Sequence, residues 1–211
     1  MRGKLICISG LDGCGKTTQS KLIYNYITKE LNLDCAFLNP FKSDKTDMVV
    51  SDKKYTRTII NFIKRYNIED DQFHCAEVLC YAQEMINTLI IPKLQEGKIV
   101  IVDRYIESSF LYFYLLGISS SRFDEIRKQL LYPDLWVFID VPPEECYRRI
   151  QQRGQQLYKT YESIEALKKQ REYSLNMQHE YRYHIIDGNR LENDVFKLIK
   201  ELVHKYVLSG I

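Results

Sequence analysis

The chain has 211 residues, of which 45% are apolar and 27% charged, an ordinary composition for one soluble domain with a full core. Its formal net charge of +2 argues against a nucleic-acid-binding protein, because such proteins usually carry a strongly basic face. The six cysteines show no Cys-x-x-Cys pair and no metal-ligand spacing with the four histidines, which predicts reduced thiols and a cytoplasmic location.

The first residues form an apolar, strand-like run, so no signal peptide is expected. No apolar run approaches the roughly 20 residues of a membrane helix, so no membrane partner is expected. Short apolar runs then alternate with segments of helical period, which predicts a parallel sheet covered on both faces in a single domain, residues 1–211. The expected strands are residues 4–9, 34–38, 98–102, 135–140 and 183–187. The expected helices are residues 15–31, 55–66, 71–95, 106–116, 122–130, 143–152, 162–181 and 191–206, and residues 41–54 are expected to form a loop near a mobile subdomain.

Between the first strand and the first helix, the residues GLDGCGKT match the pattern G-x-x-x-x-G-K-[ST] in full. Glycines let the backbone curl around phosphate oxygens, and the following helix points its positive end at the anion. A chance match would arise about once in a hundred random chains of this size, and the strand–helix context disfavours it further. We expect Lys16 to bridge the β- and γ-phosphates of ATP and Thr17 to complete the shell of Mg²⁺. The residues expected to contact the nucleotide here are Gly10, Asp12, Gly13, Cys14, Gly15, Lys16, Thr17 and Thr18.

No N-K-x-D guanine motif follows, which favours a small kinase over a GTPase. The run KIVIVDRY supports this interpretation, because it places Asp103 and Arg104 at the carboxyl end of a buried strand, where ligands of open α/β sheets bind. Asp103 can position Mg²⁺ or its water, and Arg104 can hold an acceptor phosphate in bidentate fashion. The alternative interpretation is a local salt bridge or a helix cap.

Four segments carry a family resemblance: ISGLDGCGKTTQ, GKIVIVDRYIESS, PDLWVFIDVPPEECYRRIQQRG and HIIDGNRLENDV. In order and spacing, over nearly the whole chain, they resemble the thymidylate kinase family. The resemblance implies an α/β, three-layer P-loop NTPase fold with a five-stranded parallel sheet, a flexible lid at about residues 150–162, and a homodimer. The implied activity is ATP- and Mg²⁺-dependent phosphorylation of a nucleoside monophosphate, with dTMP converted to dTDP.

The resemblance also assigns roles to individual residues. Asp12 is similar to the acid that contacts the 3′-hydroxyl of the acceptor sugar, and Arg104 to the arginine that grips the acceptor phosphate. Arg149 resembles the arginine that lies against the adenine ring, and Asn189 would sit in the loop beside that ring. Arg153 opens the lid that folds over the transferred phosphoryl group, and we expect it to be catalytic together with Lys16, Asp103 and Arg104.

The lid is expected to supply a positive charge that some family members place inside the phosphate loop. Where those members have an arginine, this chain has Gly13 or Cys14. Phosphoryl transfer needs cations around the equatorial oxygens, so the charge must come from elsewhere. The candidates are Arg149, Arg153 and Lys159.

The acceptor-base pocket departs from the family pattern at three places. Lys42 is the only substitute for an arginine after the second strand, and Phe113 stands where a glutamine often reads thymine. The third helix usually carries an Ala-x-Arg segment, but this chain has YAQE at residues 81–84, without an arginine. Either the pocket reads thymine through other groups or the acceptor differs. The groups considered for reading thymine are Gln83, Glu84 and Ser109, and the aromatics considered for stacking on a base or for the core are Tyr81, Tyr112, Phe113 and Tyr114.

Two alternative functions remain open at this point. One is a kinase for another nucleotide, a nucleoside or a small phosphorylated metabolite, and for a nucleoside Glu107 or Glu84 could serve as the base near the 5′-hydroxyl. The other is a non-catalytic nucleotide-binding homologue. The intact Lys16, Thr17, Asp103 and Arg104 argue against the second.

Overall fold

The structure is a computed structural model, and it describes residues 2–39, 80, 82–115, 117, 131–154 and 159–210. The loop expected at residues 41–54 and the helices expected at 55–66 and 122–130 lie outside the described residues. So do residues 71–79 and 81 of the helix expected at 71–95, and residues 155–158 of the expected lid.

The centre of the molecule is a five-stranded sheet in which all neighbouring strands are parallel, in the order β2-β3-β1-β4-β5. This confirms the predicted fold class, and each strand lies within one residue of its predicted bounds. The register places Ile8 of β1 beside Asp103 of β3, and Gly10 beside Ile139 of β4. The strands are β1 (Leu5–Gly10), β2 (Cys35–Leu38), β3 (Ile99–Asp103), β4 (Leu135–Asp140) and β5 (His184–Asp187).

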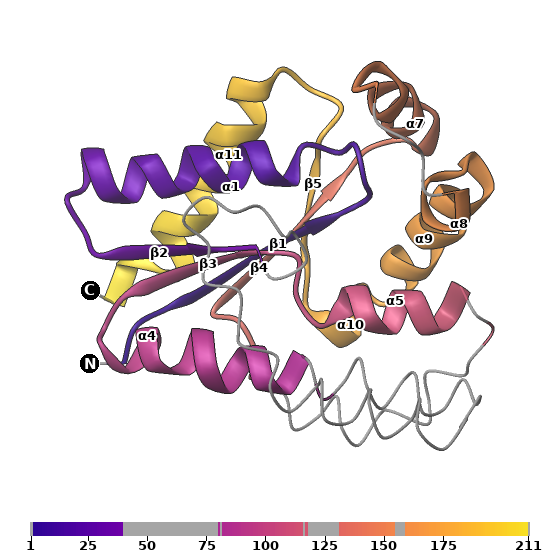
Figure 1. Cartoon of the computed structure of the whole chain (residues 1–211). Coiled ribbons are helices and arrows are strands. Elements are labelled where there is room, and N and C mark those ends of the chain that lie inside the picture. The colour runs from indigo at the N-terminus through magenta and orange to yellow at the C-terminus, as the bar shows by residue number, and fades with distance from the viewer. Residues whose placement is uncertain are drawn as a thin grey trace.

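Helices cover both faces of this sheet (Figure 1). On one face lie α1 (Lys16–Asn25), which continues as the π-helical segment η1 (Tyr26–Glu30), and α11 (Glu192–Tyr206), followed by the short η4 (Leu208–Gly210). On the other lie η2 (Ile86–Ile90), α4 (Ile91–Gln95) and α5 (Glu107–Leu115). The remaining helices are α7 (Pro143–Gln152), α8 (Lys159–Glu162), α9 (Ile164–Asn176) and α10 (Gln178–Tyr181), and α7 to α9 lie beyond the carboxyl ends of the strands. Within the described ranges, no helix combines the length and apolar character that a bilayer crossing requires.

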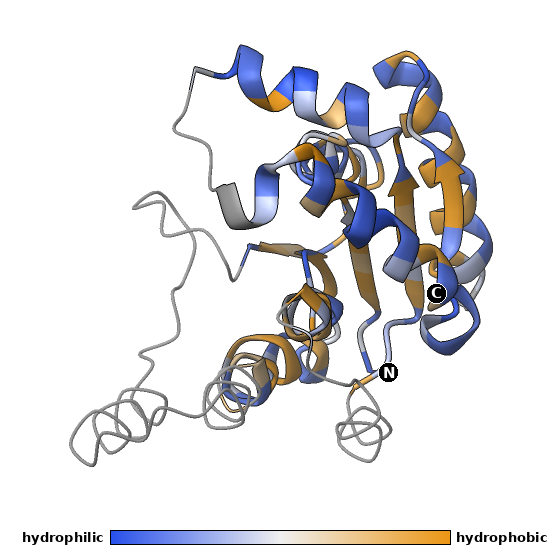
Figure 2. Ribbon diagram, turned by 90° about the vertical axis from the view of Figure 1, so that its right-hand side faces the viewer, coloured by the Kyte–Doolittle hydropathy of each residue, from blue (hydrophilic) through white to orange (hydrophobic). Residues whose placement is uncertain are grey.

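The side chains of β1 alternate between two apolar clusters, which shows that the sheet is buried on both faces. Leu5 and Cys7 pack into one apolar cluster, and Ile6 and Ile8 pack into a second cluster on the opposite face. Successive side chains of a strand point to opposite faces, so a strand between two helical layers must be apolar throughout. Figure 2 shows this arrangement as apolar strands enclosed by helices with polar outer surfaces.

The helix predicted at residues 162–181 is divided into α9 and α10, and its first predicted residue, Glu162, is the last residue of α8. The break before α9 occurs at Ser163, whose side chain accepts a hydrogen bond from the N–H of Ala166 at 3.1 Å. A serine at this position satisfies one of the free N–H groups at a helix start, so a new helix begins there. The second break lies at Met177, and α10 ends at Arg182, which has a positive φ of 54°.

Candidate active site

The phosphate loop joins β1 to α1 and is held in a conformation that requires glycine. Gly13 and Gly15 have φ values of 86° and 98°, in the left-handed region that side chains disfavour. A Cβ added to Gly13 would lie 2.4 Å from the carbonyl oxygen of Cys146, at the start of α7. The loop therefore packs directly against the backbone of α7, and Cys14 is buried beside it. Burial raises the pKa of the Cys14 thiol, so this cysteine is a neutral packing residue.

Lys16 and Arg104 share one carboxylate, that of Asp12 in the phosphate loop. Lys16 is the first residue of α1 and is buried; its Nζ donates to the carbonyl oxygen of Leu11 at 2.7 Å and lies 3.5 Å from Asp12 Oδ1. Arg104 Nη2 also donates to Asp12 Oδ1. The cation at the end of β3 thus reaches the loop that follows β1, because these two strands are neighbours in the sheet.

Thr17 and Asp103 form a second contact between the same two segments. Thr17 Oγ1 donates to Asp103 Oδ2 at 2.5 Å, and Asn39 Nδ2 donates to the same oxygen at 2.9 Å. The other oxygen of Asp103, Oδ1, is buried and has no hydrogen-bond partner among the described residues. A hydroxyl beside a carboxylate with a free oxygen is a donor set that suits Mg²⁺. In the described part of the chain no cluster of three His, Cys, Asp or Glu side chains offers an all-protein metal cage.

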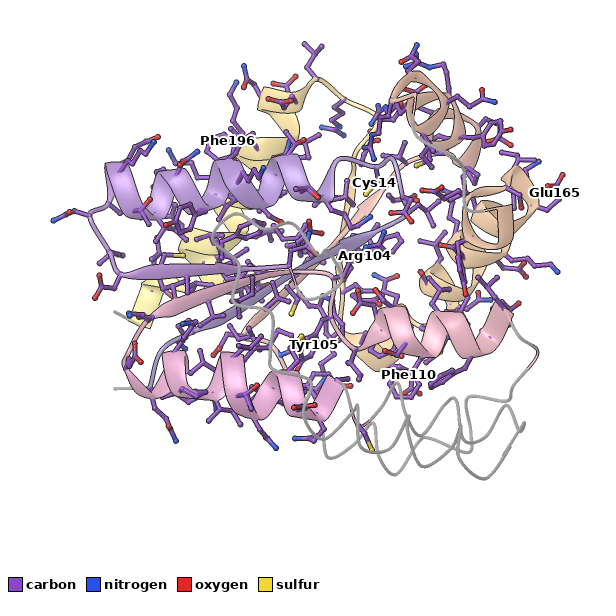
Figure 3. The ribbon with its side chains drawn as sticks, in the orientation of Figure 1. Cys14, Arg104, Tyr105, Phe110, Glu165 and Phe196 are labelled. Atoms are coloured by element: carbon purple, nitrogen blue, oxygen red, sulfur yellow. The ribbon has the colours of Figure 1, made fainter. Side chains whose placement is uncertain are left out.

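Arg104 has an unusual backbone for a long side chain, with a φ of 73°. A non-glycine residue in this region costs on the order of 1–3 kcal/mol and persists only where its surroundings hold it. Its N–H donates to the carbonyl oxygen of Ile8 at 3.2 Å, which ties the turn after β3 to β1. Figure 3 shows Arg104 at the same end of the sheet as Cys14, with Tyr105 below it.

Three other predicted residues come from the segments that follow β4 and β5. Arg149, on α7, donates from Nε to Glu145 Oε1 at 2.6 Å. Arg153 is exposed at the end of α7, and Asn189 is exposed in the turn after β5. Within the described residues, no hydrogen bond or ion pair joins any of these three to the phosphate loop. Thr18 is likewise exposed, one residue beyond Thr17 on α1.

The cations of α7 are held by one carboxylate. Glu145 accepts two hydrogen bonds from Arg148, both at 2.7 Å, and one from Arg149. Hydrogen bonds from Arg148 and then Arg149 lower the pKa of the Glu145 carboxyl to about 2. Arg149 is therefore held by a residue of its own helix. The family resemblance predicts that its guanidinium lies against an adenine ring.

Two of the aromatic residues considered for the acceptor base can be placed. Phe113 is fully buried and meets Phe110 edge to face at 6.0 Å, which makes it a core residue. Tyr114 is 39% exposed and lies 4.7 Å from the ring of Tyr173 on α9. Tyr81, the side chain of Tyr112, Lys42 and the side chain of Lys159 lie outside the described residues.

The polar candidates for the acceptor pocket differ in exposure. Gln83 is exposed and donates to Asn87 at 3.0 Å, while Glu84 and Ser109 are buried. Glu107 is also buried and accepts hydrogen bonds from Ser9 and from the N–H of Tyr105. A carboxylate engaged in this way is poorly suited to serve as the base for a nucleoside hydroxyl, since such a base must reach the proton it removes.

The sequence alone did not single out Asn39, which contacts Asp103, or the pairing of Asp140 with Arg171. The signal for Asn39 was its place directly after the second strand, at the edge where ligands bind. Arg171 on α9 makes two hydrogen bonds to Asp140 at the end of β4, at 2.7 and 2.8 Å. That pair anchors α9 beside the site, and no sequence pattern connects its two members.

The whole chain is similar to proteins of one family. The family description "Thymidylate kinase" matches residues 8–199. A thymidylate kinase from Caldanaerobacter subterraneus subsp. tengcongensis is 34% identical over 216 residues, covering 98% of each chain. One from Thermoanaerobacter sp. strain X514 is 32% identical, covering 98% of this chain and 100% of its own. A probable thymidylate kinase from Thermococcus gammatolerans is 31% identical, covering 99% and 100%.

Proposed function

The chain belongs to the thymidylate kinase family, and from this premise we propose that it transfers the γ-phosphoryl group of ATP to dTMP, which forms dTDP and ADP. The observation that carries this proposal is the Asp12 carboxylate, which pairs with Lys16 and with Arg104. Lys16 is the donor-phosphate lysine of the loop pattern, and Arg104 is the arginine expected on the acceptor phosphate. Because Lys16 and Arg104 pair with the same carboxylate, the proposed ATP half and the proposed acceptor half of the site would lie side by side.

The donor half is proposed to consist of the loop and α1. Loop N–H groups and the amino end of α1 would hold the phosphates, with Lys16 on the β- and γ-phosphates. Arg149 and Asn189 would flank the adenine ring. Thr17 and Asp103 are proposed to hold Mg²⁺, and the free Asp103 Oδ1 supports this assignment. When bound, the metal neutralises charge on the transferred group.

The acceptor half is proposed to depend on Arg104 and Asp12. Arg104 would orient the acceptor phosphate, and Asp12 would contact the sugar hydroxyl. An oxygen of that phosphate forms a bond to the γ-phosphorus while the bond to the bridging oxygen of ADP breaks. A phosphate dianion is already nucleophilic, so no strong general base is required. Arg153 would bring a further cation from the lid, at about residues 150–162.

Two properties beyond the reaction are also proposed. The family resemblance suggests a homodimer. Five cysteines in the described ranges are free thiols, which supports a reducing compartment such as the cytoplasm. Size-exclusion chromatography with light scattering tests the first of these proposals, and a dimer is expected at micromolar concentration.

The experiment that tests the function measures ADP production with a panel of nucleoside monophosphates and unphosphorylated nucleosides. We expect dTMP to give the highest kcat/KM and thymidine to give no turnover. Lys16→Met is the control and should remove nearly all transfer without unfolding the protein. Bound ATP with no turnover on any acceptor would overturn the kinase proposal. Turnover with nucleosides only would overturn the role of Arg104.

A further inference from the structure

Glu107 is a buried acid beside the site that the proposed reaction does not use. It lies in the first turn of α5 with only 7% of its surface exposed. Its Oε1 accepts a hydrogen bond from Ser9 Oγ at 2.6 Å, and its Oε2 accepts one from the N–H of Tyr105 at 3.1 Å. Ser108 Oγ also donates to Oε1, at 3.4 Å. Every partner is a donor, which is the arrangement that an ionised carboxylate requires.

Ser9 connects this carboxylate to the phosphate loop. It is buried at the end of β1, directly before Gly10, and its Oγ accepts a hydrogen bond from Trp136 Nε1 of β4 at 2.9 Å. Because Trp136 fills one acceptor position of the hydroxyl, the hydrogen of Ser9 points to Glu107. One chain of hydrogen bonds therefore joins β4, β1 and the turn after β3.

That turn carries Arg104 in its left-handed conformation. The N–H of Arg104 reaches Ile8, the neighbour of Ser9, while the next residue, Tyr105, is held at two points. The N–H of Tyr105 donates to Glu107, and its hydroxyl donates to the carbonyl oxygen of Leu131 at 2.7 Å. The conformation of Arg104 thus depends on groups that flank it on both sides.

We propose that Glu107 is a positioning residue for Arg104: with Ser9 it fixes the turn after β3 to the start of the phosphate loop, so that the Arg104 guanidinium stays against Asp12. The proposal rests on the proposed function, in which Arg104 orients the acceptor phosphate. Burial raises the pKa of the Glu107 carboxyl, and the Ser9 hydrogen bond and the charge of Arg104 oppose part of that rise. The carboxylate therefore acts through its hydrogen bonds and its attraction for Arg104, without contacting substrate.

The competing interpretation is that Glu107 only stabilises the fold. Replacing a buried polar network by apolar groups of similar size is often neutral for stability, whereas removing one partner is costly. The double variant Ser9→Ala/Glu107→Leu removes both side chains of the Ser9–Glu107 hydrogen bond, so neither of the two is left without the other. The N–H of Tyr105 and Nε1 of Trp136 lose their acceptors in this variant, and its stability is therefore measured alongside its activity. Glu107→Gln keeps one acceptor oxygen for Ser9 and should act as a partial rescue. Glu165→Gln is the matched control, since Glu165 is an exposed glutamate in the first turn of α9 (Figure 3).

The experiment measures KM for dTMP and for ATP separately in the parent and in these three variants. We expect the double variant to raise the KM for dTMP at least tenfold with less than a twofold change in the KM for ATP. The KM for dTMP of Glu107→Gln should lie between those of the double variant and the parent. Both KM values of Glu165→Gln should match those of the parent. An equal change in both KM values, or none, would overturn the positioning role. Thermal unfolding of each variant separates these outcomes from loss of the fold.

A second readout does not depend on turnover. Amide hydrogen exchange at Arg104 reports the turn directly, because this N–H bonds to Ile8 and not to Glu107. We expect exchange at Arg104 to accelerate at least tenfold in the double variant and not in Glu165→Gln. Unchanged exchange would overturn the proposal whatever the acceptor is. A parent protein with a protected Arg104 amide but no activity on any nucleotide would instead refute the proposed function alone.

Discussion

Gly13→Ala tests whether the phosphate loop depends on its close packing against α7. Gly13 has a φ of 86°, and a Cβ added there would lie 2.4 Å from the carbonyl oxygen of Cys146, a backbone atom that no side-chain rotation can move away. Gly117→Ala is the matched control. Gly117 has a φ of 76°, and no described atom lies within 4 Å of an added Cβ. The two substitutions therefore share the backbone cost and differ in the steric contact.

The shared cost is that of placing a residue with a Cβ in the left-handed region, about 1 kcal/mol of unfolding free energy. Only Gly13→Ala must also widen a contact from 2.4 Å to at least 3.0 Å, the closest approach that real Cβ atoms show. Forcing extra atoms into a packed site costs about 1–3 kcal/mol. We therefore expect losses of about 1 kcal/mol for Gly117→Ala and about 2–4 kcal/mol for Gly13→Ala, measured by urea denaturation.

Activity should separate the two variants more clearly than stability. A misplacement of about 1 Å in a catalytic site can lower the rate roughly 100-fold. The loop in Gly13→Ala must move by more than half of that distance, so kcat/KM for ATP should fall about 10- to 100-fold, against less than twofold for Gly117→Ala. ADP production under subsaturating ATP measures both. Equal kcat/KM values in folded samples of the two variants would refute the packing argument.

Four further predictions concern single side chains. Arg104→Ala should raise the KM for the acceptor at least tenfold and the KM for ATP less than threefold, in steady-state assays. Arg153→Ala should lower kcat at least tenfold while the thermal midpoint stays unchanged, because the side chain is exposed and makes no ion pair within the described ranges. Ser163→Ala should cost about 1 kcal/mol in urea denaturation through loss of the α9 cap, and Ser163→Asp should restore it. Burial raises the folded pKa of the Glu107 carboxyl above its ordinary value of 4.5, so the stability that Glu107 contributes is full below that pH and is lost as the pH rises through the folded pKa. The unfolding free energy of the parent relative to Glu107→Gln should therefore decrease as the pH is raised above 4.5.

The sheet could be predicted almost to the residue because its strands are buried on both faces. A run such as LICI has no polar position to expose, so the strand begins after Lys4 and ends at Ser9 and Gly10. The phosphate loop was equally readable, since its function fixes both the residue types and their spacing. Arg104 and Asp103 were found for a related reason: they end a buried strand at the ligand-binding edge.

The contacts that the sequence did not reveal depend on which strands become neighbours in the sheet. Asn39 meets Asp103 because β2 pairs with β3, and Glu107 meets Ser9 because β3 pairs with β1. A glutamate in the first turn of a helix is usually solvated, so its burial here had no local signal. The start of α9 was predicted two residues early, at residue 162, because only the capping hydrogen bond of Ser163 marks where the helix begins.

Asp12 makes one contact that follows from the local sequence pattern and one that follows from strand pairing. Its pairing with Lys16 spans four residues and belongs to the local pattern, whereas its pairing with Arg104 joins segments 92 residues apart. The second pairing exists because β1 and β3 lie side by side in register, with Ile8 beside Asp103. One carboxylate consequently balances Lys16 of the phosphate loop and Arg104 of the turn after β3, the cations proposed for the donor and the acceptor half. In the proposed reaction, a movement of the loop that carries Asp12 would therefore shift both cations together.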